Sequence, residues 1–174
     1  YNAQGQQLGT ANAFFVGNNT QVATAYSALK DAYKAEVVDF KGNKYPLHRI
    51  LGANSTTDLV LFNITEAPKK GYFFHISTTA SSKGANLQMW QYTTNKKSVS
   101  TPVSIERAEP YNSYTYYYTN IANTDTHLTC PLTDDEGNIV AIVQKNVAKD
   151  ATGACAIDAR FFNDMGIKVT DAFN

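Results

Sequence analysis

The feature that most constrains the fold of this chain is its division into short, strand-sized runs separated by turn residues. The run Ala13-Phe-Phe-Val-Gly17 is followed by Asn18-Asn19 and then by Gln21-Val-Ala-Thr24, which predicts a β-hairpin. The run Leu59-Val-Leu-Phe62 is apolar at every position, so we expect a strand buried on both faces. Many such runs, spaced by Gly, Asn, Asp and Pro, predict an all-β protein built as a sandwich or a barrel.

The remaining runs predict further strands and two short helical segments. The strands are expected over residues 35–40, 44–51, 73–75, 87–92, 98–107, 113–118, 139–144 and 154–157. Residues 27–34 predict one helical turn, and residues 158–165 a terminal helix. Glu66-Ala-Pro-Lys-Lys-Gly71 is the best linker candidate, because Pro and Gly lie near its ends. We therefore divide the chain into residues 1–67, 68–158 and a terminal helix and tail, 159–174.

Charge and hydropathy exclude two classes of partner. The 15 Lys and Arg balance the 15 Asp and Glu, and no basic cluster is longer than a pair such as Lys69-Lys70. A nucleic-acid-binding protein usually has a basic face, so we expect no nucleic-acid partner. No apolar run is long enough to cross a bilayer, so we expect no membrane insertion. The start at Tyr1, without a methionine, favours a trimmed form.

Cys130 and Cys155 are the only two cysteines of the chain. Neither is part of a Cys-x-x-Cys pair, so a structural zinc site is not expected, and no motif indicates another metal or a cofactor. The residues alone leave two alternatives open, one disulfide or two buried thiols.

Three segments in a fixed order carry a recognisable pattern. They are Gly9-Thr-Ala-Asn-Ala-Phe-Phe-Val16 with Val22-Ala-Thr-Ala-Tyr-Ser-Ala28, then Ser55-Thr-Thr-Asp-Leu-Val-Leu-Phe62, then Thr119-Asn-Ile-Ala-Asn-Thr-Asp-Thr-His-Leu-Thr-Cys-Pro-Leu132. Together they resemble the bacterial trypsin-like serine proteases of the HtrA type. Two later segments, Glu136-Gly-Asn-Ile-Val-Ala-Ile-Val143 and Gly153-Ala-Cys-Ala-Ile157, are similar to the strands that follow the nucleophile in that family.

The resemblance implies a fold and a location. The fold is two antiparallel Greek-key β-barrels, one over residues 1–67 that lacks part of its first strand and one over residues 68–158, with a short C-terminal helix. The location is secreted, periplasmic or cell-surface.

The same resemblance implies that the catalytic triad is lost. Asp58 matches the triad aspartate, whereas Ser27 stands at the histidine position and Leu128 at the serine position. Imidazole is the base of the triad and a hydroxyl is its nucleophile, so these two replacements remove both functions. Thr126 replaces a glycine of the oxyanion loop, and positive φ is costly for a β-branched residue, so we expect a different loop shape. Asp58 should then bond to hydroxyl or N–H groups, with Ser27 among them.

The favoured function is therefore a non-catalytic module that binds or positions an unknown protein or peptide partner. The alternative is a peptidase or esterase with a relocated nucleophile, for which His127, Thr129 and Cys130 are the candidates. A third possibility is a domain that serves mainly to position a neighbour in a longer protein. His127 lies beside Leu128, and the simpler interpretation is a histidine on a surface loop.

The segment Tyr111-Asn-Ser-Tyr-Thr-Tyr-Tyr-Tyr118 is unusually rich in tyrosine. The simpler interpretation is a strand whose rings are alternately buried and exposed. The functional interpretation is a contact surface, because tyrosine is enriched at protein interfaces. Its members would be Tyr114, Tyr116 and Tyr118, and by the resemblance they would flank the former active-site loop with His127 and Thr129.

By the same resemblance, Cys130 and Cys155 both border the specificity pocket. A disulfide requires a Cα separation of roughly 4.4–6.8 Å, which adjoining positions can meet, so we expect a Cys130–Cys155 bond that closes the pocket. Two buried thiols are the other possibility.

Overall fold

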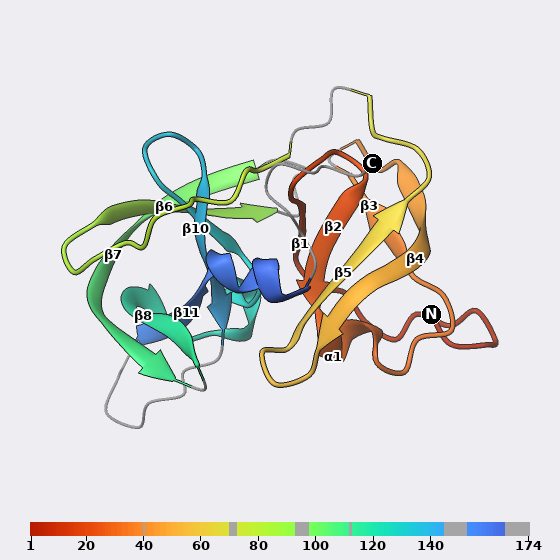
Figure 1. The fold of residues 1–174 in the computed structure, drawn as a ribbon. Coiled ribbons are helices and arrows are strands. Elements are labelled where there is room, and N and C mark those ends of the chain that lie inside the picture. The colour runs from red at the N-terminus through yellow and green to blue at the C-terminus, as the bar shows by residue number, and fades with distance from the viewer. Residues whose placement is uncertain (40, 70–72, 93–97, 112, 145–152, 166–174) are drawn as a thin grey trace.

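The structure is a computed structural model that describes residues 1–39, 41–69, 73–92, 98–111, 113–144 and 153–165. Strands dominate these residues and form two units that lie side by side, one sheet and one barrel (Figure 1). The predicted all-β fold is therefore confirmed. No helix among the described residues is long and apolar enough to span a membrane.

The first unit is a curled antiparallel sheet of five strands in the order β1-β2-β5-β4-β3. Its elements are β1 (Ala13–Phe15), β2 (Gln21–Ala25), α1 (Tyr26–Leu29), β3 (Glu36–Val38), β4 (Lys44–Asn54) and β5 (Leu59–Ile64). The predicted hairpin is present, with Ala13 paired to Thr24. The Asn18 side chain accepts the N–H of Thr20 at 2.9 Å, which closes the turn between the two strands.

The second unit is a closed barrel of six strands in the order β10-β11-β8-β7-β6-β9. Its elements are β6 (Asn86–Tyr92), β7 (Ser98–Tyr111), β8 (Tyr114–Ala122), η1 (Asp125–His127), β9 (Pro131–Thr133), β10 (Ile139–Gln144), β11 (Gly153–Asp158) and η2 (Ala159–Met165). The short helices η1 and η2 are 3₁₀ helices, and η2 is the predicted terminal helix.

Two details differ from the sequence prediction. The first unit is an open sheet rather than a closed barrel, because none of the described residues supplies a sixth strand between β1 and β3. The helical turn predicted over residues 27–34 is shorter and begins one residue earlier, at Tyr26. The boundary at residues 67 and 68 lies in the connection between β5 and β6 and stays a prediction.

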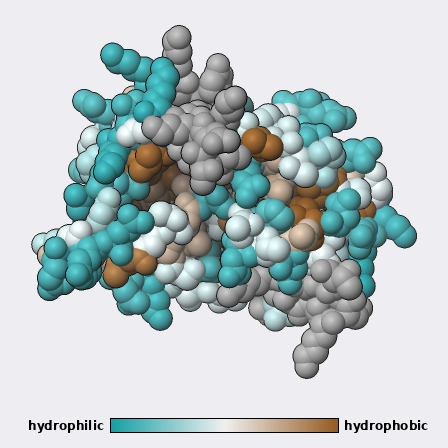
Figure 2. Space-filling model, turned by 180° about the vertical axis from the view of Figure 1, so that it is seen from behind, coloured by the Kyte–Doolittle hydropathy of each residue, from teal (hydrophilic) through white to brown (hydrophobic). Residues whose placement is uncertain are grey.

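Within the part of the chain that the structure describes, the core consists of three apolar clusters. One fills the barrel around Leu87, Tyr117 and Leu132, and one small cluster packs on the sheet around Val22, Phe62 and Ile64. The third is shared by both units and includes Ala23, Leu59 and Leu61 from the sheet with Tyr116, Ile142, Cys155 and Phe162 from the barrel and η2. On the face seen in Figure 2, apolar residues reach the surface only in small, separate patches.

Candidate functional site

The positions matched to the triad aspartate and histidine are neighbours, as the strand register requires. Ala25 at the end of β2 pairs with Leu59 at the start of β5, so the residues just beyond these ends lie together. The N–H of Ser27 donates to Asp58 Oδ1 at 2.7 Å, and the Ser27 hydroxyl donates to Asp58 Oδ2 at 2.9 Å. The expectation that Asp58 bonds to Ser27 is confirmed.

Both carboxylate oxygens of Asp58 are thus occupied by one serine. Asp58 itself has a left-handed backbone, with φ of 55°, and its carbonyl accepts the N–H of Tyr26 at 3.0 Å. In a triad the carboxylate orients an imidazole, which then takes the proton of the nucleophile. The group that Asp58 orients here is an exposed hydroxyl, which is not a base at neutral pH. The contact fixes the start of α1 and supplies no general base.

In the loop of residues 124–130, where the resemblance places the nucleophile at Leu128, several amide groups are bonded within the protein. The Leu128 N–H bonds to the Asp125 carbonyl at 3.2 Å within η1, and the Thr129 N–H bonds to the Val143 carbonyl of β10 at 2.8 Å. An oxyanion hole needs N–H groups that point at the reacting oxygen. Both amides are already engaged within the protein, so neither points at a reacting oxygen.

Backbone strain in this loop lies at Thr129. Its φ is 68°, in the left-handed region that β-branched residues rarely adopt, and its side chain is buried. Thr126, which the resemblance matches to a glycine of the oxyanion loop, lies in η1 and is not among the described residues with positive φ. The left-handed residue of this loop thus lies three positions after Thr126, and a loop shape different from that of the family stays a prediction.

Two side-chain amides hold the loop from outside. Asn12, just before β1, donates to the carbonyls of Thr126 and Leu128 at 3.0 and 2.9 Å. Gln91 of β6 also donates to the Thr126 carbonyl, at 3.1 Å. No sequence signal pointed to Asn12 or Gln91, because both contacts join segments far apart in the chain. The loop is thus fixed to both units.

His127 is oriented by backbone rather than by a nucleophile. Its Nδ1 lies 2.9 Å from the Ala122 carbonyl and 3.3 Å from the Thr124 hydroxyl. A carbonyl oxygen only accepts hydrogen bonds, so Nδ1 carries the proton and cannot take one from Thr124. This arrangement does not support a relocated Thr–His nucleophile in the loop.

The expected disulfide is absent, because Cys130 and Cys155 face opposite sides of the barrel wall. Ala154 and Ala156 point into the barrel, where Cys130 also lies, and side chains alternate along a strand. Cys155 between them therefore points outward, into the core shared by the two units. Burial raises the pKa of the Cys130 thiol to about 12, so Cys130 is also a poor nucleophile at neutral pH.

We therefore expect two titratable thiols in the denatured, unreduced protein. A chromogenic aromatic disulfide reagent measures them, and the native protein should react slowly because both side chains are buried. A sample that is reduced and then denatured again is the control, because it gives the total number of thiols. A count below two before reduction would contradict the separation of the two cysteines.

The prediction of a tyrosine contact surface is largely wrong. Tyr116 and Tyr118 are only 3% and 5% exposed, so they cannot form an exposed contact surface. Both faces of β8 are covered: Tyr117 fills the barrel, while Tyr116 and Tyr118 pack in the shared core. The Arg107 guanidinium also lies 4.3 Å from the centre of the Tyr118 ring. Thr129 is buried as well, which leaves Tyr114 and His127 as the accessible members.

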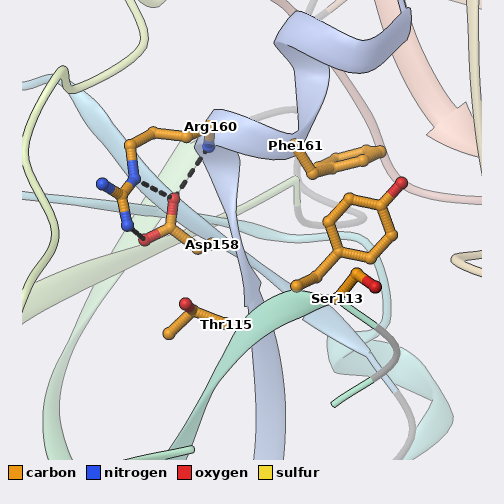
Figure 3. A pocket seen from close by; sticks show the side chains of 6 residues that line it. Ser113, Thr115, Asp158, Arg160 and Phe161 are labelled. Carbon is orange, nitrogen blue, oxygen red and sulfur yellow. Dashed lines mark hydrogen bonds and ion pairs between the residues drawn. The ribbon is translucent and has the colours of Figure 1, made fainter. Parts of the chain in front are cut away.

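Tyr114 lines an open hollow of about 210 Å³ at the start of β8 and the end of β11. Figure 3 shows this hollow, whose wall consists of Ser113, Tyr114, Thr115, Asp158, Arg160 and Phe161. The rings of Tyr114 and Phe161 meet edge to face at 5.9 Å. The loop of residues 124–130 follows the opposite end of β8, so the hollow is separate from it.

The arrangement of the two units matches known structures. A serine endoprotease from Yersinia pestis superposes with a TM-score of 0.75 at 14% identity, over 94% of this chain and 58% of that one. The inactive form of the Rv3671c protease from M. tuberculosis gives a TM-score of 0.70 at 14% identity, over 91% and 82%. The HtrA-type protease AlgW, solved with a decapeptide, gives 0.70 at 16% identity, over 91% and 50%. The chain has the trypsin-like serine protease fold.

The trypsin-like fold is therefore established by structure and not by sequence. No protein-family model matches the chain, and none of the curated proteins matches it. This chain spans about half of AlgW and somewhat more of the Yersinia protein. A trypsin-like fold at this level of identity carries no activity with it, because function resides in the site.

Proposed function

We propose that this chain is a non-catalytic trypsin-like domain, a pseudoprotease that binds a protein or peptide partner. The observation that carries the proposal is the Asp58 carboxylate, whose two oxygens both accept hydrogen bonds from Ser27. A carboxylate that is satisfied by a serine has no imidazole to orient.

The loop geometry supports the same proposal. Leu128 offers no hydroxyl, and the N–H groups of Leu128 and Thr129 are bonded within the protein. A site without a base, a nucleophile and oriented N–H groups lacks the main sources of acyl-transfer catalysis. A location outside the cytoplasm is also part of this proposal, and the likeness to an HtrA-type structure supports it.

The test is reaction with a fluorophosphonate probe and hydrolysis of casein and simple peptide esters. We expect no labelling and no hydrolysis above buffer, while an active trypsin-like protease assayed in parallel gives both. Labelling that disappears on mutation of one named residue would instead support the alternative, a hydrolase with a relocated nucleophile.

We also expect that restoring the two lost triad residues does not restore efficient catalysis. The double variant Ser27→His with Leu128→Ser still has Thr129 at φ of 68° and an amide at position 128 bonded to Asp125. Burst kinetics with an activated ester measure acylation directly. A burst of one product per protein molecule would show that the loop adapts and that only the side chains had been lost.

A further inference from the structure

Arg160 borders the hollow of Figure 3 and is held there by a chain of hydrogen bonds. The Ser81 N–H donates to the Tyr117 oxygen at 3.0 Å, and the Tyr117 hydroxyl donates to Asp158. Asp158 in turn accepts the Nε and Nη2 groups of Arg160, at 2.9 and 3.1 Å. A guanidinium bonded to a carboxylate through two nitrogens keeps one orientation. Arg160 is therefore already fixed in the protein alone.

The Asp158–Arg160 pair has unused donors but no unused acceptors. A carboxylate has about four acceptor positions, and those of Asp158 are taken by Tyr117 and by three nitrogens of Arg160. A guanidinium has five N–H groups, of which Asp158 accepts two. The others have no acceptor among the described residues. A ligand that bonds to this pair must therefore supply the acceptor atoms.

The accessible part of the pair is its positive part. The side chain of Asp158 is 5% exposed, whereas that of Arg160 is 41% exposed. Among the described residues that line the hollow, no other side chain is charged. The two formal charges cancel at a distance, so an anion gains from this site only by direct contact with the guanidinium. Because a charged acceptor bonds more strongly than a neutral one, these donors favour a carboxylate.

The Thr115 hydroxyl is a second donor on the same side of the hollow. Ile157 of β11 pairs with Tyr116 of β8, so Asp158 and Thr115 come next to each other in the same register. Figure 3 shows the Thr115 hydroxyl directed toward Asp158 and Arg160, and it has no hydrogen bond among the described residues. A carboxylate beside Arg160 can therefore accept from Thr115 as well.

The other side of the hollow is aromatic. Figure 3 shows Phe161 across from Arg160, and the Tyr114 ring meets Phe161 edge to face at 5.9 Å. Phe161 is only 4% exposed, so the half-buried Tyr114 ring supplies the apolar surface that a ligand can reach. A ligand with a carboxylate at one end and an apolar group at the other contacts both sides.

We propose that this hollow binds a small carboxylic acid in its ionised form. The carboxylate accepts hydrogen bonds from Arg160 and Thr115, and the apolar group packs on the Tyr114 ring. The hollow has a volume of about 210 Å³, whereas pockets for drug-sized ligands have roughly 300–1,000 Å³, so it takes one ring or one side chain beside the carboxylate. A free acid and the last residue of a peptide chain share this chemistry.

The test titrates isotope-labelled protein with phenylacetate and with phenylacetamide, and follows the backbone amide signals by NMR. The amide has nearly the same shape as the acid but no charge. We expect phenylacetate to shift the signals of residues 113–115 and 160–161 and to bind about tenfold more tightly than phenylacetamide. Equal binding of the two compounds, or shifts confined to other residues, would overturn the proposal.

Thr115→Val removes the second donor and leaves the ion pair in place. Thr101→Val is the matched control, because Thr101 is an exposed threonine of β7 that does not line the hollow. We expect T115V to bind phenylacetate about fivefold more weakly than T101V, and Arg160→Gln to weaken binding about tenfold. Equal affinities of T115V and T101V would contradict the proposed position of the carboxylate. The comparison of acid and amide needs no variant and therefore holds even if R160Q does not fold.

A peptide separates the two sources of the carboxylate. The acetylated tripeptide Gly-Gly-Phe is compared as the free acid and as its C-terminal amide. Tighter binding of the free-acid peptide than of phenylacetate assigns the hollow to the end of a peptide chain, and tighter binding of phenylacetate assigns it to a free acid. The hollow is independent of the proposed function, because fluorophosphonate labelling would refute the non-catalytic domain and leave these affinities unchanged.

Discussion

Gly153→Ala should prevent the barrel from closing normally. A Cβ at position 153 would lie 1.9 Å from the Thr119 carbonyl oxygen and 3.1 Å from the Ile121 carbonyl oxygen. Both atoms are backbone of β8, which pairs with β11 here, so neither can move without breaking the ladder. Overpacking of a tight site costs about 1–3 kcal/mol and occasionally more, and a contact this short belongs at the upper end.

Gly9→Ala is the matched control for this substitution. Nothing lies within 4 Å of a Cβ at Gly9, which is exposed, so the added methyl group should leave stability nearly unchanged. Urea unfolding followed by circular dichroism measures both variants. Equal midpoints for the two would show that β8 and β11 are farther apart than described.

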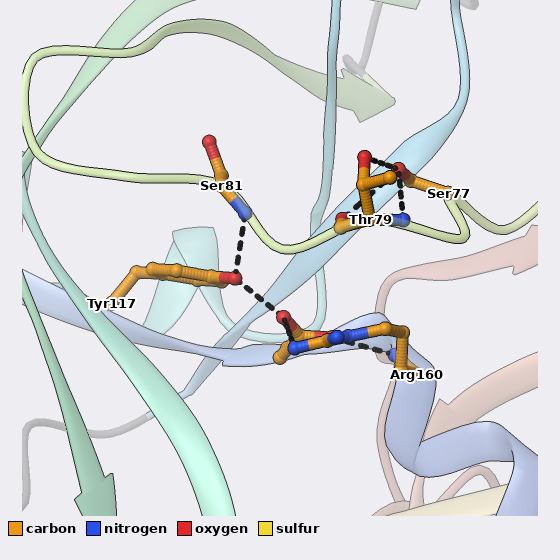
Figure 4. A network of polar contacts seen from close by, with 6 residues as sticks. Ser77, Thr79, Ser81, Tyr117 and Arg160 are labelled. Carbon is orange, nitrogen blue, oxygen red and sulfur yellow. Dashed lines mark hydrogen bonds and ion pairs between the residues drawn. The ribbon is translucent and has the colours of Figure 1, made fainter.

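Asp158→Ala should lower the unfolding free energy by about 3 kcal/mol. Hydrogen bonds to a buried charge are strong, and the donors that bonded to Asp158 would stay in place without an acceptor. The Asp158 side chain is almost fully buried and accepts from Tyr117 and from three nitrogens of Arg160, at 2.8, 2.9 and 3.1 Å. The Ser81 N–H completes this network by donating to the Tyr117 oxygen at 3.0 Å (Figure 4). The Arg160 side chain is 41% exposed, so water replaces part of the loss there.

Tyr117→Phe separates the two halves of the network. It removes the bonds to Asp158 and Ser81 but keeps the ring in the barrel and the ion pair with Arg160, so we expect a loss of about 1 kcal/mol. The same unfolding measurement applies. If Y117F lowered the unfolding free energy as much as D158A does, the Tyr117 hydroxyl, and not the ion pair with Arg160, would supply most of the stabilisation.

The order of short apolar runs and turns was sufficient to predict the β1–β2 hairpin, whose strands are neighbours in the chain. The Ser27–Asp58 contact was predicted only through the resemblance to trypsin-like proteases, because β2 and β5, which bring the two residues together, are separated by two strands in the chain. Because Ala25 pairs with Leu59, Ser27 just after β2 and Asp58 just before β5 must lie close together. The trypsin-like fold was predicted from the order and spacing of several segments that resemble that family, although no single motif is specific.

Side-chain direction could not be predicted in the same way. Cys155 lies on β11 between Ala154 and Ala156, which face the barrel, whereas Cys130 precedes β9, so no single strand period relates the directions of the two side chains. Tyr116, Tyr117 and Tyr118 are all buried because β8 is covered on both faces, and periodicity cannot show the second covering layer. The contact from Asn12 to the loop carries no local pattern at all.

The core shared by the two units has a consequence for how a partner can be recognised. Domains that close around a ligand bend at a hinge, and their facing surfaces are usually small and fairly polar. Here Leu59 and Leu61 of the sheet and Tyr116 and Phe162 of the other unit belong to one continuous apolar cluster. Hinge bending would have to pull that cluster apart and expose it to water. Any partner would therefore meet the two units as one rigid body, and its recognition would depend on surfaces that are already accessible.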